Sequence, residues 1–225
     1  MIKLIIFDWD DVFTLGSKEG YFKCYHETIT QLGIHLDSEE EKRRILSQWG
    51  KTHREGLTEL LKEHPEFIDR ACKIYEDILF GNTFVDCLSI VPGSRELLNK
   101  LQRNYTLALA TGVHPKLLKE RIIPKFDIPD VFTKIVTSYD IDDPSKLKPH
   151  PFMLETIMKS QNTLPNETVL VGDAQSDVQM AKNAGITPIV VLTGHLNQEE
   201  AQNLGVKHII KNVTHLEEIL HKLKK

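Results

Sequence analysis

The stretch Lys3-Leu4-Ile5-Ile6-Phe7-Asp8-Trp9-Asp10-Asp11-Val12 decides the fold of this chain. Its first half is a short apolar run of the kind that forms a buried strand, and its second half carries three carboxylates within four residues. Because unpaired carboxylates beside a core are costly to desolvate, the segment is either a polar turn or part of a functional site. Charged residues that follow later strands favour the second interpretation.

Four further apolar segments predict buried parallel strands. They are Tyr105–Thr111, Lys134–Ser138, Thr168–Gly172 and Thr187–Leu192, and a weaker sixth strand is expected at His208–Ile210. Helical patterns follow three of these strands, at Pro115–Ile123, Pro151–Ser160 and Ser176–Ala184. Alternation of strand and helix predicts an α/β fold with a doubly wound, parallel, Rossmann-like sheet.

The long interval between the first two strands contains no convincing strand. It carries the apolar spacing of about four or five amphipathic helices, which is far more than a simple crossover between parallel strands requires. We therefore expect an all-helical cap domain at residues 16–88. Residues 1–15 and 89–225 are expected to form the α/β core.

Composition excludes several classes of protein. Over 225 residues, 40% are apolar and 27% charged, as in ordinary globular domains, and the net charge of −4 provides no basic surface for nucleic acid or anionic lipid. The three cysteines are far apart, which fits a reducing compartment and neither a disulfide framework nor a zinc site. With no signal or membrane segment in view, we expect a cytoplasmic monomer or homodimer.

Reactive side chains follow the predicted carboxyl ends of three strands, which meet at one edge of a parallel sheet. The first strand ends at Asp8 and Asp10, the second at Thr111-Gly112, and the fourth at Gly172-Asp173-Ala174-Gln175-Ser176-Asp177. The preceding loop Lys146-Leu147-Lys148-Pro149-His150-Pro151 offers an ammonium group. Each feature alone has an ordinary explanation, such as a turn residue or a charge at a helix start. Together they predict carboxylates, a hydroxyl and a cation at one site.

The order and spacing of these residues resemble the haloacid dehalogenase superfamily, which is dominated by phosphatases. Its four motifs are matched by Asp8-Trp9-Asp10, by Thr111, by Lys148 in Lys148-Pro149-His150-Pro151, and by Gly172–Asp177, and the similarity extends to about residue 195. The helical insert after the first motif resembles the cap of the phosphoglycolate phosphatase and β-phosphoglucomutase branch. One position departs from the pattern: Asp11 stands where the family usually has glycine, and aspartate tolerates turn geometry.

The resemblance implies a role for each motif residue. Asp8 is the expected nucleophile, which forms an aspartyl-phosphate, and Asp10 is the expected general acid and base. The implied ligands of Mg²⁺ are Asp8, the backbone carbonyl of Asp10, and Asp173, while Asp177 holds a metal-bound water or Lys148. The groups implied to bind phosphoryl oxygens are Thr111, Lys148 and the backbone N–H groups of Trp9 and Gly112.

Aspartate at position 10 favours phosphatase or phosphomutase chemistry within this family. We expect a Mg²⁺-dependent hydrolase that cleaves the phosphate monoester of a small metabolite such as phosphoglycolate. A sugar phosphomutase of the β-phosphoglucomutase type stays open, as does a catalytically inactive binding module. In the insert, the basic stretch Gly50–Glu55 is equally compatible with a solvated loop and with substrate contact, and Arg54 or His53 is the residue we expect to contact substrate.

Overall fold

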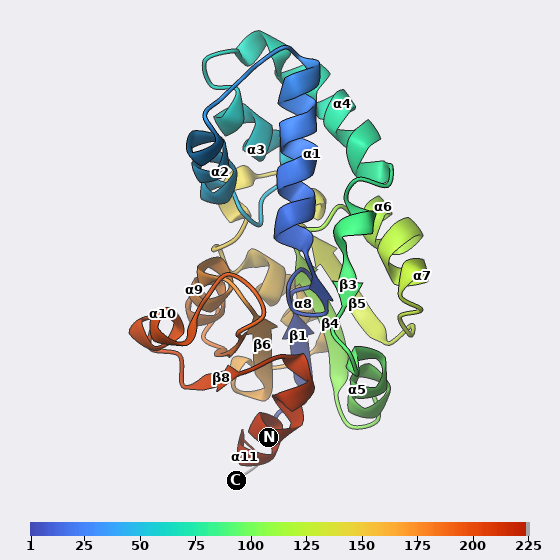
Figure 1. Cartoon of the computed structure of the whole chain (residues 1–225). Helices are drawn as coiled ribbons and strands as arrows, with labels where there is room; N and C mark the ends of the chain where they lie inside the picture. Colours follow the sequence, from blue (N-terminus) through green and yellow to red (C-terminus); the bar gives the residue numbers. More distant parts are fainter. Residues whose placement is uncertain (224–225) are drawn as a thin grey trace.

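A central parallel sheet organises the molecule, as the computed structural model in Figure 1 shows for residues 1–223. Its strand order is β5-β4-β1-β6-β7-β8. The strands are β1 (Leu4–Phe7), β4 (Thr106–Thr111), β5 (Phe132–Thr137), β6 (Thr168–Gly172), β7 (Thr187–Val191) and β8 (His208–Ile210). Every predicted strand is present, and the α/β, doubly wound, Rossmann-like prediction is confirmed.

Strand β1 lies in the middle of the sheet, and Ile5 pairs with both Leu107 of β4 and Val169 of β6. All of β1 is buried, with Ile5 and Phe7 on one face of the sheet and Leu4 and Ile6 on the other. A strand covered on both faces has no polar side, which is why this segment is a continuous apolar run.

Helices cover both faces of the sheet. Helices α5 (Ser94–Leu101) and α11 (Leu216–Leu223) contribute to the same apolar cluster as Ile5 and Phe7. Helices α8 (Phe152–Gln161) and α9 (Gln175–Asn183) pack on the opposite face, and α10 (Gln198–Asn203) follows β7.

The predicted helix at Pro115–Ile123 is a helical stretch of mixed type. It consists of α6 (Pro115–Leu117), a π-helical turn (Leu118–Ile122) and α7 (Ile123–Lys125). Pro124 has no backbone N–H and its ring crowds the preceding turn, so a regular α-helix cannot continue through this position.

Residues between the first strand and α5 form a helical insert at the carboxyl-end side of the sheet, away from the two chain termini (Figure 1). Its helices are α1 (Ser17–Gln31), α2 (Ser38–Ser47), α3 (His53–Leu60) and α4 (Ile68–Phe80), with 3₁₀ turns at Pro65–Phe67 and Val85–Cys87. Tyr25, Ile29, Leu57 and Tyr75 are among its buried side chains. We propose that residues 1–15 and 89–225 form a core domain and that residues 16–88 form a cap domain.

Two short strands that the sequence did not predict connect the insert to the sheet. Strand β2 (Thr14–Leu15) pairs antiparallel with β3 (Ser89–Ile90), so that Thr14 faces Ile90. Two residues per strand are too few to give a periodic signal in the sequence. The chain therefore enters and leaves the insert at the same place.

None of the helices within residues 1–223 combines the length and the apolar character that crossing a membrane demands.

Candidate active site

The sheet brings the predicted motif residues to one edge. Asp8 directly follows β1, Thr111 ends β4, and Asp173 directly follows β6, while Lys148 reaches the site from the loop before α8. All four residues are buried, and Lys148 is only 2% exposed. Fully buried lysines are rare unless they are paired, so this lysine requires partners.

Lys148 bridges two carboxylates. Its Nζ atom lies 3.0 Å from Asp8 Oδ2 and 2.8 Å from Asp177 Oδ1. Burial disfavours the ammonium form, but the charges of Asp177 and Asp8 outweigh burial and raise the pKa of Lys148 above its ordinary value. Asp177 Oδ2 also accepts a hydrogen bond from the backbone N–H of Ala174. Lys148 is therefore a fixed positive charge beside Asp8.

Three carboxylates converge next to this lysine. Oxygen atoms of Asp8, Asp173 and Asp177 all lie within 4.8 Å of one another. Burial raises the pKa of Asp8 despite the opposing effect of Lys148, and burial followed by the charges of Asp177 and Asp8 raises that of Asp173 well above its ordinary value. A single ammonium group leaves this cluster with excess negative charge. An all-oxygen set of this kind suits a hard divalent cation, which would offset the repulsion.

Asp10 connects the sheet edge to the first helix of the insert. Its Oδ1 atom accepts a hydrogen bond of 2.8 Å from the hydroxyl of Ser17, the first residue of α1. Burial, and next the charges of Asp8 and Asp11, raise the pKa of Asp10 to about 8. Ser17 was not predicted as a site residue, because a single serine after a turn carries no motif.

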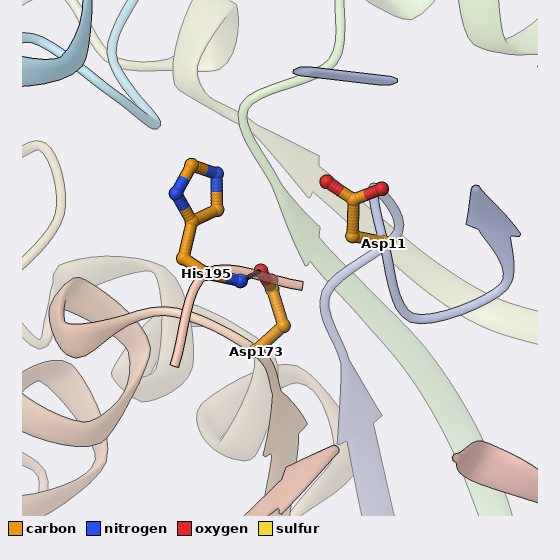
Figure 2. A group of neighbouring side chains, drawn as sticks. All are labelled: Asp11, Asp173 and His195. Atoms are coloured by element: carbon orange, nitrogen blue, oxygen red, sulfur yellow. Dashed lines mark hydrogen bonds between the residues drawn. The ribbon is translucent and has the colours of Figure 1, made fainter. Parts of the chain in front are cut away.

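Asp11 adopts the left-handed backbone conformation, with φ of 54°, that the usual glycine would adopt without strain. Its burial, and next the charge of Asp8, raise its pKa to about 6. Figure 2 shows Asp11 with Asp173 and His195, which form a second group of ligand-type atoms within 4.8 Å. The backbone N–H of His195 donates to Asp173 Oδ2 at 2.9 Å.

The loop after β7 thus belongs to the site, although the sequence analysis did not include it. A Cβ atom on Gly194 would lie 1.9 Å from Asp173 Oδ2, so glycine is the residue that lets this loop approach the carboxylate. The position of this loop could have indicated its role, because β7 is the neighbour of β6 and the loop leaves the carboxyl end of β7.

Trp9, Thr111 and Gly112, at the same edge of the sheet, have different local partners. The backbone N–H of Trp9 donates to Asp8 Oδ1 at 2.7 Å, while its ring is buried against Phe13. The hydroxyl of Thr111 accepts from the backbone N–H of Val113. Gly112 lies against the insert, because an added Cβ atom would be 3.1 Å from the backbone of Gly50.

A cavity between the sheet edge and the insert opens onto the carboxylates of Asp8 and Asp10. It contains about 560 Å³ of empty space, counting its open mouth. Its lining includes Asp8, Asp10, Gly112, Tyr21, Tyr25, Gln48, Trp49, Gly50, Lys51, His53, Tyr75, His114 and Tyr139.

The two insert residues expected to contact substrate differ in position. His53 lines the cavity and is 8% exposed. Arg54, the next residue, does not line it: its Nη2 atom is 2.8 Å from Asp69 Oδ1, and its side chain is 57% exposed. The structure therefore brings His53, and not Arg54, together with the carboxylates. Adjacent helix positions point about 100° apart, so the two side chains leave α3 in different directions.

Comparison with known proteins identifies the family. The profile of haloacid dehalogenase-like hydrolases matches residues 5–191. The chain is 29% identical to a phosphorylated carbohydrates phosphatase of Thermotoga maritima over 99% of both chains. It is 28% identical to a phosphoglycolate phosphatase of Vibrio vulnificus over 64% of this chain and 63% of that one.

A solved structure described as a haloacid dehalogenase-like hydrolase from Bacteroides fragilis aligns with 96% of this chain and 100% of its own. Its TM-score is 0.81 at 18% identity, which supports the fold. The profile match covers the strand that ends at Asp8, the loop of Lys148 and the segment Gly172–Asp177. The chain belongs to the haloacid dehalogenase-like hydrolase family.

Proposed function

We propose that the protein is a Mg²⁺-dependent phosphatase that hydrolyses the phosphate monoester of a small metabolite through an aspartyl-phosphate on Asp8. The observation that supports this most directly is the contact of Lys148 with Asp8 beside Asp173, since Asp8 also lines the cavity. The names of the two curated relatives support a small phosphorylated substrate.

Each step of the proposed reaction is assigned to one residue. One oxygen of Asp8 attacks phosphorus while the bond from phosphorus to the leaving oxygen breaks, and Asp10 gives that oxygen a proton. Asp10 then takes a proton from water, whose oxygen attacks the aspartyl-phosphate and releases inorganic phosphate and free Asp8. Lys148, the hydroxyl of Thr111 and the backbone N–H of Gly112 would bind the phosphoryl oxygens.

Asp8, Asp173 and the backbone carbonyl of Asp10 are the groups that would hold Mg²⁺, with Asp177 supporting them through Lys148. The ion would supply positive charge for the substrate phosphate, which several carboxylates would otherwise repel. The oxygen-only character of these donors fits Mg²⁺.

The proposal is tested by phosphate release from a panel of phosphate monoesters, with Mg²⁺ and with EDTA. Turnover that requires Mg²⁺ and yields one phosphate per ester consumed supports a phosphatase. Conversion of one sugar phosphate isomer into another without net release of phosphate would favour a phosphomutase. No turnover of any ester would favour a binding module.

Asp173→Asn should raise the Mg²⁺ concentration required for half-maximal rate by about tenfold or more, since an amide is a poorer ligand than a carboxylate. In EDTA the variant should unfold at the same or a higher temperature than wild type. Burial and neighbouring charges raise the pKa of the Asp173 carboxyl, so its ionised form destabilises the fold, and the amide removes that ionisable group. Mg²⁺ titrations of rate and of unfolding temperature check both results.

Asp130→Asn is the matched control, since Asp130 is exposed and precedes β5, at the amino ends of the strands and away from the site. It should respond to Mg²⁺ as wild type does. An unchanged Mg²⁺ requirement in Asp173→Asn would remove Asp173 from the metal site.

A further inference from the structure

The loop that joins α2 to α3, residues 48–52, lies against the edge of the sheet that carries Asp8. We call it the α2–α3 loop. An added Cβ atom on Gly112 would be 3.1 Å from the backbone of Gly50, and one on Gly50 would be 3.4 Å from Cδ of Lys148. Lys148 is only 2% exposed. The α2–α3 loop therefore covers the lysine that contacts Asp8.

A hydroxyl group of the core holds the middle of this loop. Ser138 Oγ donates a hydrogen bond of 2.7 Å to the backbone carbonyl of Gly50, although the two residues are 88 positions apart in the chain. Ser138 is fully buried and begins the 3₁₀ turn Ser138–Asp140 directly after β5. The turn is itself fixed, because Asp140 Oδ2 accepts from the backbone N–H of Thr137 at 2.7 Å and from its hydroxyl at 2.9 Å. A rigid part of the core thus supplies the donor.

A second hydroxyl of the same turn holds the end of the loop. Tyr139 Oη accepts the backbone N–H of His53, the first residue of α3, at 3.1 Å and lies 2.7 Å from its Nδ1. Burial, and next the charge of His114, lower the pKa of His53 to about 4, so the ring is neutral at pH 7. Glu76 Oε1 lies 3.4 Å from Nε2 and favours hydrogen on that nitrogen. Nδ1 then accepts from the Tyr139 hydroxyl, which donates one hydrogen bond and accepts another.

The loop itself offers little apolar surface to bury against the core. Gly50 has no side chain, and Trp49 divides its ring contacts between Tyr21 of the insert and His195 of the core. Segments with few buried apolar contacts open locally more easily than the core of a domain does. The position of the loop therefore depends strongly on the two hydroxyls of the turn.

We propose that Ser138 and Tyr139 are positioning residues, which fasten the α2–α3 loop over Lys148. We call their hydrogen bonds to Gly50 and His53 the latch. Its part in catalysis rests on the proposed phosphatase function, in which a covered site keeps water from the reacting groups. Loss of either hydroxyl lets the loop lift more often and admits water to Lys148.

Amide hydrogen exchange tests the latch without any substrate. In Ser138→Ala, loss of one hydrogen bond should make the amides of residues 49–53 exchange about three- to tenfold faster, where exchange follows the opening equilibrium. The His53 amide is the most informative one, since its acceptor is Tyr139 and the substitution leaves that pair in place. Amides of β6 should keep their wild-type rates.

Ser145→Ala is the matched control, since Ser145 is exposed and its hydroxyl donates to Asp143 Oδ1 at 2.7 Å within its own turn. It should exchange as wild type does. Unchanged exchange of residues 49–53 in Ser138→Ala would overturn the latch, whether or not the protein is a phosphatase. Faster exchange throughout the chain would show a general structural role and would overturn it as well.

Tyr139→Phe tests the second contact and connects the latch to turnover. It removes the acceptor of the His53 amide, so this amide should again exchange about three- to tenfold faster. With Mg²⁺ and an ester that the wild type hydrolyses, kcat/KM should fall by about three- to tenfold in Ser138→Ala and in Tyr139→Phe.

Wild-type kcat/KM in variants whose loop amides exchange faster would overturn the positioning role. Absence of turnover in every protein, wild type included, would overturn the phosphatase proposal and the catalytic part of the inference, and the exchange rates would still decide whether the latch exists.

Discussion

Asp8→Asn is expected to reduce turnover of every phosphate ester by a factor on the order of 10⁴ or more. The amide cannot supply the anionic oxygen that attacks phosphorus, so the covalent route is lost. The fold should survive, because asparagine has the same shape and removes a buried charge whose pKa is raised by desolvation. Phosphate release measured against wild type, together with thermal unfolding of both proteins, checks the two expectations.

A direct measurement separates the nucleophile from a residue that only binds metal. Acid-quenched wild type, mixed with substrate and Mg²⁺, should carry a phosphoryl group on the peptide that contains Asp8, and Asp8→Asn should carry none. Asp8→Glu keeps the charge but shifts it by one methylene, and it should be nearly as inactive as Asp8→Asn because in-line attack depends on position. Turnover by Asp8→Asn within tenfold of wild type would exclude Asp8 as nucleophile.

Lys148→Met should be the most damaging substitution for stability at this site. It leaves the carboxylates of Asp8 and Asp177, both buried, without their shared ammonium group. Breaking a buried ion pair by removal of one partner costs about 3–5 kcal/mol of unfolding free energy. The loss of a fixed cation at the phosphoryl site should also lower kcat/KM by about 10²- to 10³-fold.

The pH dependence of this destabilisation has a definite sign. Without Lys148, the folded protein holds the Asp8 carboxyl at a pKa further above its unfolded value, so the folded state binds more protons than the unfolded state. Stability of the variant should therefore fall as pH rises from mildly acidic values, more steeply than that of wild type. Denaturant unfolding in EDTA at several pH values measures this.

Lys146→Met is the matched control for that series. Lys146 lies in the same loop, but its side chain is 45% exposed and its Nζ atom is 3.8 Å from Asp143 Oδ2, and surface pairs of this kind contribute little. The control should keep wild-type stability and activity. If Lys148→Met matched it, the buried bridge would have no part in stability or catalysis.

The strands and the residues at their ends were predictable for a shared physical reason. Buried parallel strands must be apolar throughout, so Leu4–Phe7 and Thr168–Gly172 stand out in the sequence, and a carboxylate directly after such a run is conspicuous. Parallel strands also place their ends at one edge, which is how Asp8 and Asp173, far apart in the chain, could be expected to meet.

Other residues of the site were not predictable in the same way. Tyr139 and His195 come from loops after β5 and β7, and no local pattern distinguishes them from packing or surface residues. Arg54 was favoured for its charge, but Asp69, the partner that holds it outside the cavity, lies on α4, and their contact depends on helix packing. Side-chain direction in the insert is thus fixed by tertiary structure.

The strand pair of Thr14–Leu15 with Ser89–Ile90 has a consequence for how such a chain can diversify. Because the two junctions are neighbours, inserting a segment of different length between them would add little to the entropy lost on closing the loop. Such a segment would leave the register of β1 with β4 undisturbed. Under the proposed function, the reacting carboxylates and the cavity-lining rings of Tyr21, Tyr25, Trp49 and Tyr75 lie on separable stretches of polypeptide. A new preference can arise by exchange of one stretch while the other is kept.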